Sequence, residues 1–287
     1  EALVQSLDEL WQRRIIREQG GAAYDFSHDK IREAAYSGVS LARRRLLHRR
    51  VAQALVKLHP EDLETVSGQI GRHYELAGLP APAVAHYRRA AEASERVYAN
   101  ADAILYYRRA LVLLDSLPGE RQTRAALWER LGDILQVTRE FEAARSAYRQ
   151  ALEPLMALDR TSQARLLRKL GKAWREERHY DQAQQALDEA ARLMSAQPSL
   201  DAGAADAMDA AARHEWVELQ IDLNQLQYWQ NRLPEAAARI ETLSALVEQH
   251  AAADQRIRYF ISAAMICLRR DRYAPSESSR AYFHAAQ

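Results

Sequence analysis

Cysteine is nearly absent from this 287-residue chain, which contains only Cys267. A single cysteine excludes a disulfide framework and a cysteine-rich zinc site. No run of about eighteen apolar residues occurs, so no segment is predicted to span a membrane. The net charge is only +1, and together with a hydrophobic fraction of 48% this low charge excludes an intrinsically disordered chain.

Glycine and proline are scarce as well, with 10 and 8 residues, and β-branched residues are few. Alanine, leucine, arginine, glutamate and glutamine are common instead, and all of them favour helices. The composition therefore predicts an all-α protein. No cleavable signal segment is visible at the start, so the cytoplasm is the expected location.

The first 60 residues have a pattern of their own. The predicted elements are a helix over 2–18 that ends at Gly20-Gly21, a strand over 22–26, a helix from the N-cap Ser27 to Tyr36, and a helix over 41–58. Helices around a short strand-like wing are typical of a winged-helix module. We therefore expect a partial winged-helix module and linker helix over 1–60, followed by a second domain over 61–287.

Beyond residue 60, helical segments alternate with short breaks, as they do in antiparallel helix pairs. Breaks are expected at 78–80, 99–100, 117–119, 139–140, 159–160, 179–180, 197–198, 232–234 and 270–271. An Ala- and Asp-rich stretch over 198–212 reads as a longer loop or a weakly held helix start.

One pattern recurs three times within these segments. The units are Ile70-Gly71-x2-Tyr74 with Ala83-x3-Tyr87, Trp128-x2-Leu131-Gly132-x2-Leu135 with Ala144-x3-Tyr148, and Leu167-x2-Leu170-Gly171-x2-Trp174 with Ala183-x3-Leu187. A half-unit occurs at Ala103-x3-Tyr107 and a weaker one at Ala236-x3-Ile240. Glycine inside a helix costs about 1 kcal/mol relative to alanine. Its recurrence therefore predicts a repeated close approach of two helices, with Ala83, Ala144 and Ala183 as the small partners.

These units resemble the tetratricopeptide repeat. The resemblance implies a right-handed superhelix of roughly five helix hairpins that recognises a protein, a peptide or a small effector on its concave face. The spacing departs from the family's period, because Gly71 and Gly132 lie 61 residues apart and Gly132 and Gly171 lie 39 apart. We therefore expect longer or additional helices.

A second resemblance covers about residues 1–115. It depends on Phe26-Ser27-His28-Asp29, Ile31-Arg32, Tyr36, the arginines at 43–45, and His48-Arg49. This segment is similar to the one that joins the winged-helix domain to the helical repeats in bacterial STAND-type signalling ATPases, including LuxR-family activators of the maltose-regulator kind. The resemblance implies a sensor or regulatory arm of an ATPase that controls transcription or another output domain.

The same resemblance implies that His28 and Asp29 sense a nucleotide bound to the ATPase domain. The alternative is that both residues simply start a helix, where the helix dipole favours aspartate. The chain begins with Glu1 rather than methionine, so we expect it to be a piece of a longer protein. ATP or ADP is expected only in an upstream domain, because Gly171-Lys172 is followed by Ala173 and forms no phosphate-binding loop.

No residues support an enzyme, a cofactor or a metal site. His214-Glu215 lacks the second histidine of a zinc helix, since Glu218 stands at that position. No nucleophile and base have the spacing of a catalytic site. We therefore expect a non-catalytic protein.

Two features are candidates for ligand binding. Arg165, Arg168, Lys172 and Arg175 share one helix face, which favours an acidic peptide or a carboxylate ligand in the concave groove. The alternative is a solvated face balanced by Glu176 and Glu177. Tyr228-Trp229 is the second groove candidate, and its alternative is packing in the core.

The helix over 41–58 contains no acidic residue. Its basic patch consists of Arg43, Arg44, Arg45, Arg49 and Arg50. A solvated face, or partners for another domain, explains these arginines better than a nucleic-acid site does. A nucleic-acid-binding helical protein and a free-standing tetratricopeptide adaptor are the alternatives to the sensor arm, and homo-oligomerisation stays open.

Overall fold

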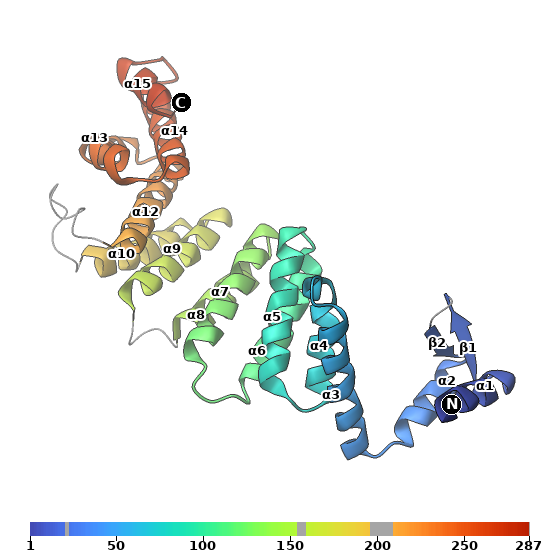
Figure 1. The fold of residues 1–287 in the computed structure, drawn as a ribbon. Coiled ribbons are helices and arrows are strands. Elements are labelled where there is room, and N and C mark those ends of the chain that lie inside the picture. The colour runs from blue at the N-terminus through green and yellow to red at the C-terminus, as the bar shows by residue number, and fades with distance from the viewer. Residues whose placement is uncertain (21–22, 154–158, 196–208, 287) are drawn as a thin grey trace. The chain divides into compact units, whose positions relative to one another are not determined.

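The computed structural model describes residues 1–20, 23–153, 159–195 and 209–286. The chain divides into two compact units, residues 1–93 and 94–287. Within the described ranges there are fourteen α-helices and one two-stranded sheet (Figure 1). The all-α, helix-hairpin prediction is confirmed. The division at 93/94 differs from the expected domain border at 60/61, which stays a prediction.

The first unit begins with a helix, a β-hairpin and a second helix, and continues into longer helices. Its elements are α1 (Ala2–Gln12), β1 (Ile16–Gln19), β2 (Ala23–Phe26), α2 (Asp29–Ser37), α3 (Leu41–Leu58), α4 (Leu63–Leu76) and α5 (Pro80–Arg96), of which α5 runs past residue 93. The predicted helix over 41–58 is confirmed, and Ser40 caps its first turn by accepting a hydrogen bond from the Arg43 amide.

Two expectations for this unit are wrong. The first helix ends at Gln12 rather than at 18, because Ile16–Gln19 pairs antiparallel with Ala23–Phe26. Ile16 is β-branched and becomes buried on this hairpin, which favours a strand there. His28, and not Ser27, precedes the first turn of α2, since the Ser27 amide donates a 2.9 Å hydrogen bond to the Ile15 carbonyl. The winged-helix assignment itself stays a prediction.

The second unit is a succession of helices. They are α6 (Asn100–Leu114), α7 (Arg121–Val137), α8 (Phe141–Leu152), α9 (Arg160–Glu176), α10 (Tyr180–Ser195), α12 (Ala210–Trp229), α13 (Leu233–His250), α14 (Ala253–Arg270) and α15 (Glu277–Ala285). In Figure 1, α7, α8, α9 and α10 follow one another as neighbours, and consecutive members of this series are in contact.

Eight of the nine expected breaks coincide with helix boundaries. The ninth, at 197–198, lies outside the described residues, as does most of the Ala/Asp-rich stretch over 198–212. The break between α13 and α14 was not predicted. Residues 251–253 are all alanine, which favours a helix and gives no stop signal, yet Ala251 is extended with ψ 151°.

The same tight turn joins the two helices of four hairpins. Three residues link α4 to α5, α7 to α8, α9 to α10 and α12 to α13. The middle residue is left-handed each time, with φ between 61° and 73°; these residues are Gly78, Arg139, Arg178 and Asn231. A link this short forces the two helices to run antiparallel and to meet face to face.

The glycines lie where the helices of a hairpin approach most closely. A Cβ atom placed on Gly132 would lie 2.6 Å from Cε1 of Tyr148, and one on Gly71 would lie 2.8 Å from Cδ1 of Tyr87. A Cβ on Gly171 would lie 2.9 Å from the side chain of Leu187. The close approach was predicted, but the alanine partner was not found at Gly71 or Gly132; at Gly171 the Ala183 carbonyl oxygen, 3.2 Å from the added Cβ, joins Leu187. The glycine packs against the large side chain four residues after the alanine, and the alanine itself is fully buried.

The fourth hairpin keeps this spacing but not its glycine. Each glycine precedes the left-handed turn residue by seven positions, and in α12 that position is Asn224. The large residue sixteen positions later is Ile240, which is fully buried. The Asn224 Oδ1 accepts a 2.8 Å hydrogen bond from Arg239. A polar side chain therefore stands where the other three hairpins have a glycine packed against a large side chain.

We predict that Gly132→Ala destabilises the protein by about 1–3 kcal/mol, because the new methyl group would overlap the Tyr148 ring. The ring has little freedom to move, since its hydroxyl lies 3.0 Å from both Asp133 and Gln136. Urea unfolding followed by circular dichroism measures the change. Gly38→Ala is the control, because its Cβ atom would have only an ordinary 3.4 Å contact. A Gly132→Ala protein as stable as wild type, or more stable, would contradict the prediction.

Candidate functional site

The cation row on α9 lies among carboxylates of the same chain. Arg165 donates two hydrogen bonds to Glu129 of α7, at 2.8 and 3.1 Å. Arg168 and Arg175 are buried and face α12, where both pair with Asp222 at 2.8 and 3.0 Å. Arg168 also binds Glu215 through its Nε. Three of the four cations are thus neutralised inside the second unit.

The network extends from α12 to α14. Glu218 accepts hydrogen bonds from Arg258, at 3.0 Å, and from Gln255, at 2.9 Å. Burial would raise the pKa of Glu218, but the hydrogen bonds from Arg258 and Gln255 and the charge of Arg168 outweigh burial and lower this pKa to about 2. Burial dominates at Glu215 and raises the pKa of its carboxyl group despite the neighbouring Arg168. Ion pairs therefore join α12 to the buried arginines of α9 and to the half-exposed Arg258 of α14.

These contacts correct one expectation from the sequence. Arg168 and Arg175 are structural partners of α12 and do not form an open row with the other two cations. Lys172 is exposed, and no ion pair of Lys172 occurs within the described ranges. It lines a polar cavity of about 580 Å³ together with Lys169, Asp133 and Glu176. Ligand binding by Arg165 and Lys172 stays a prediction.

The acidic half of this network was missed at the sequence level. Glu215, Glu218 and Asp222 are spaced by three and four residues, so they share one face of α12. That spacing matches the spacing of the cations on α9. Opposite charges with matched spacing on neighbouring repeats were a signal for an interface between the two helices.

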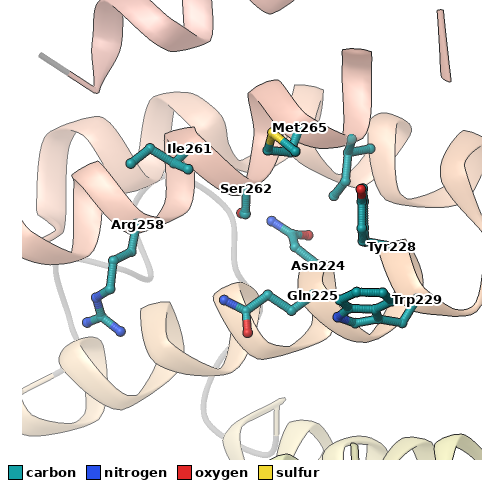
Figure 2. Close-up of a pocket in the computed structure, with 9 residues that line it drawn as sticks. Asn224, Gln225, Tyr228, Trp229, Arg258, Ile261, Ser262 and Met265 are labelled. Carbon is teal, nitrogen blue, oxygen red and sulfur yellow. The ribbon is translucent and has the colours of Figure 1, made fainter. Parts of the chain in front are cut away.

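Tyr228 and Trp229 line an apolar cleft between α12 and α14. The cleft has a volume of about 430 Å³, and Figure 2 shows side chains of both helices around it. Its lining residues are Asn224, Gln225, Tyr228, Trp229, Arg258, Ile261, Ser262, Met265 and Ile266. Trp229 is 58% exposed, Ile261 45% and Met265 39%. Trp229 is therefore open to solvent beside the cleft, whereas Tyr228 is half-buried and also packs against the core of this unit. Ligand binding by the pair stays a prediction.

Charged groups lie near both ends of this cleft. Arg269 stacks its guanidinium over the Tyr228 ring, 4.6 Å from the centroid, and donates a 2.7 Å hydrogen bond to the Tyr228 carbonyl. No carboxylate pairs with Arg269 in the part of the chain that the structure describes. Arg258, in contrast, already pairs with Glu218 and Asp254. Arg269 is therefore a cation without a carboxylate partner that lies next to the lining residue Tyr228, although it does not itself line the cleft.

His28 and Asp29 are both exposed at the start of α2. Asp29 pairs with Arg32 at 2.8 Å within the first turn. This placement suits a helix start, and nucleotide sensing by the two residues stays a prediction. The basic patch lies on α3, where Arg43, Arg45, Arg49 and Arg50 are exposed and Arg44 stacks over Tyr36.

No cluster of three metal-ligating side chains occurs among the described residues. Within the same residues, no helix is long and apolar enough to cross a membrane. Cys267 is buried in α14, and burial raises the pKa of its thiol.

The hairpins, with their shared turn and glycine crossing, give the chain a tetratricopeptide-like helical-repeat fold. No known family profile matches the chain. A protein of Rhizobium meliloti (strain 1021) whose function is uncharacterised is 33% identical over 161 residues, which is 53% of this chain. The chain spans only 16% of the length of that relative.

Three solved structures resemble the fold at low identity. BtubC from P. vanneervenii is 17% identical with a TM-score of 0.48, over 83% of this chain and 95% of that one. A STAND protein with a tetratricopeptide repeat sensor, from Pyrococcus horikoshii, is 16% identical with a TM-score of 0.47, over 98% of this chain and 38% of that one. Pseudomonas aeruginosa pilF is 15% identical with a TM-score of 0.45, over 86% and 99%.

We predict that the protein loses stability in acid partly through Glu218. Its pKa is lowered from the usual 4.5 to about 2, so its contribution is complete above pH 4.5 and disappears as the pH falls towards 2. The contribution amounts to up to about 3 kcal/mol. Urea unfolding at pH 7, 4.5 and 3 measures it. The difference in unfolding free energy between wild type and Glu218→Gln should shrink as the pH falls, and a constant difference would contradict the prediction.

Proposed function

We propose that this chain is a non-catalytic recognition scaffold that binds an apolar segment of a protein partner in the cleft between α12 and α14. The observation that carries the proposal is the exposure of Trp229, Ile261 and Met265 around one concavity. Large apolar side chains that surround a cleft release water when a ligand covers them, and such sites anchor binding partners.

The lining supports a particular kind of segment. The cleft extends along α14 from Arg258 to Ile266, which is about 12 Å at 1.5 Å per residue. That length accommodates one to two turns of a helix or a short extended stretch. The unneutralised Arg269 beside Tyr228 favours a carboxylate next to the apolar side chains of the ligand. An acidic peptide was expected from the sequence, but this cleft suits it better than the α9 row does.

We predict that Trp229→Ser weakens binding of the dye 8-anilinonaphthalene-1-sulfonate by about tenfold, a loss of about 1.4 kcal/mol. The dye joins aromatic rings to an anionic group, so it tests the apolar wall and the positive end together. Dye fluorescence measures the affinity. Leu105→Ser on α6 is the matched control, because Leu105 is 50% exposed and lines neither this cleft nor the apolar cavity beside Trp128.

A peptide library displayed on phage then tests the ligand class. Selection on wild type, with counter-selection on Trp229→Ser, should enrich sequences that combine apolar residues with an acidic one. Equal dye binding by Trp229→Ser and wild type, or enrichment of peptides without apolar residues, would contradict the proposal.

We further propose that the scaffold acts as the sensor or regulatory arm of a STAND-type signalling ATPase. The resemblance over residues 26–49 supports this role. The matched stretch is only 16% of its Rhizobium meliloti relative, so a related segment occurs inside a much longer protein. In this mechanism, a ligand in the cleft binds the active arrangement of the parent more tightly than the resting one. The difference in affinity shifts the population towards the active state.

The coding sequence next to this chain provides the first test of that role. A phosphate-binding loop upstream of Glu1 would support the sensor arm, and a gene without one would favour a free-standing adaptor. If the loop is present, a selected peptide should change the rate of ATP hydrolysis by the parent protein, and Trp229→Ser should remove this response. ATP and ADP are expected to bind only in the ATPase domain.

A further inference from the structure

Helix α3 carries an apolar stripe that the described chain leaves partly exposed. The stripe consists of Leu47, Val51, Ala54 and Leu58, and these four residues define the outer stripe of α3. Leu47 is 45% exposed, Val51 40% and Leu58 72%. Steps of four, three and four residues keep all four on one face of the helix.

The inner face of α3 has its partners already. Ala52 is fully buried, and α3 contacts α4. His48 Nδ1 lies 2.9 Å from His73 Nδ1 of α4, and His48 Nε2 lies 3.0 Å from the Tyr36 hydroxyl. Consecutive helical residues are about 100° apart, so the outer stripe lies well round the helix from His48 and Ala52. Packing on α4 therefore leaves the outer stripe free for a second helix.

The outer stripe has the spacing of a coiled-coil seam. Val51 and Leu58 fall at the a position of a heptad and Leu47 and Ala54 at the d position. The g position, which borders such a seam and selects its partner by charge, is basic in every heptad. Arg43, Arg50 and Lys57 occupy it.

None of these three cations has an ion-pair partner among the described residues, nor do Arg44, Arg45 and Arg49. The arginines of α9 differ, since Arg165, Arg168 and Arg175 all bind carboxylates. Helix α3 itself contains no acidic residue. The edge of the seam is thus an uncompensated row of positive charge.

This charge determines which helix can pair with the outer stripe. A second copy of α3 in antiparallel orientation would place g positions opposite g positions, and the cations would repel one another. A second copy in parallel orientation would need the e positions, and His48 at e is already bound to α4. A partner helix with leucine-like residues would cover the apolar seam, and glutamate or aspartate opposite the g positions would neutralise the three cations.

We propose that the outer stripe of α3 docks an acidic amphipathic helix of a partner domain or protein, with Arg43, Arg50 and Lys57 as the charge-selecting edge. A membrane surface is a poorer match, because α3 contains no tryptophan or phenylalanine and its apolar stripe is narrow. Nucleic acid would pair with the cations but would leave Leu47, Val51 and Leu58 in water. This docking surface is independent of the cleft between α12 and α14.

The test uses the full 287-residue chain and a synthetic three-heptad peptide with leucine at a and d and glutamate at e and g. Fluorescence anisotropy of the labelled peptide measures its affinity. Leu47→Gln/Val51→Gln and Arg43→Glu/Arg50→Glu should each weaken binding by about tenfold or more. The controls Val112→Gln and Arg121→Glu change exposed residues outside the stripe and should bind as wild type does. Circular dichroism verifies that each variant is folded.

Charge reversal provides a gain of function. The Arg43→Glu/Arg50→Glu protein should bind a peptide with lysine in place of glutamate more tightly than wild type does. Trp229→Ser should not change the affinity for the acidic peptide. If it does, the peptide occupies the α12–α14 cleft, which overturns the proposal for α3 and leaves the proposed function standing.

Three other results would overturn the proposal. Equally tight binding of a scrambled peptide with the same net charge would show that only net charge matters and that the seam does not. Unchanged affinity in the Leu47→Gln/Val51→Gln protein would exclude a role for the seam. Tighter binding of duplex DNA, or of phosphatidylserine vesicles, than of the acidic peptide would assign the basic edge to those ligands instead.

Discussion

The close crossing of two helices within a hairpin is the constraint on which the rest of this structure depends. A hairpin brings its helices together through a three-residue turn, and at Gly71, Gly132 and Gly171 the second helix approaches so closely that a methyl group would not fit. Each glycine is a local cost to its helix of about 1 kcal/mol, which the buried large side chain opposite offsets. Because these three hairpins each bury one face in this way, their other faces are left to pack on neighbouring helices or to contact a ligand.

The fourth hairpin shows what happens when the constraint is relaxed. Asn224 replaces the glycine, its side chain bonds to Arg239, and the same residue lines the apolar cleft with Tyr228 and Trp229. On the N-terminal side of the cleft residues of α12, Glu215 and Asp222 pair with the buried Arg168 of α9, and Glu218 pairs with the half-exposed Arg258 of α14. Buried ion pairs of this kind fix the register of neighbouring helices more than they add to stability. Helix α12 thus combines a charged segment that is fixed by ion pairs with an apolar, partly open segment near its C-terminal end, and a recognition site benefits from that combination.

The two proposed surfaces differ in their chemistry. The α12–α14 cleft is concave and mainly apolar, and the unneutralised guanidinium of Arg269 stacks on one of its lining residues, Tyr228. The outer stripe of α3 is a convex helix face with a basic edge, and it belongs to the first unit. A ligand that inserts side chains suits the first surface, whereas a helix that lies alongside suits the second. A scaffold with two such surfaces can couple the binding of one partner to its contact with another, provided that each partner distinguishes between two states of the scaffold.

The sequence by itself determined the helices and their pairing. Glycine and proline breaks, helix propensity and the Gly–Ala–large pattern are local, so eight breaks and the bounds of α3 were predictable. The β1–β2 hairpin was not, because Ile16 fits a helix or a strand until Phe26 pairs with it. Only the tertiary structure showed which charges pair. The sequence suggested that Arg168 and Arg175 contact a ligand, whereas in the structure both pair with Asp222, some fifty residues away. The exposure of Trp229 was decided in the same way, since periodicity places a residue on a helix face but cannot tell whether another helix will cover that face.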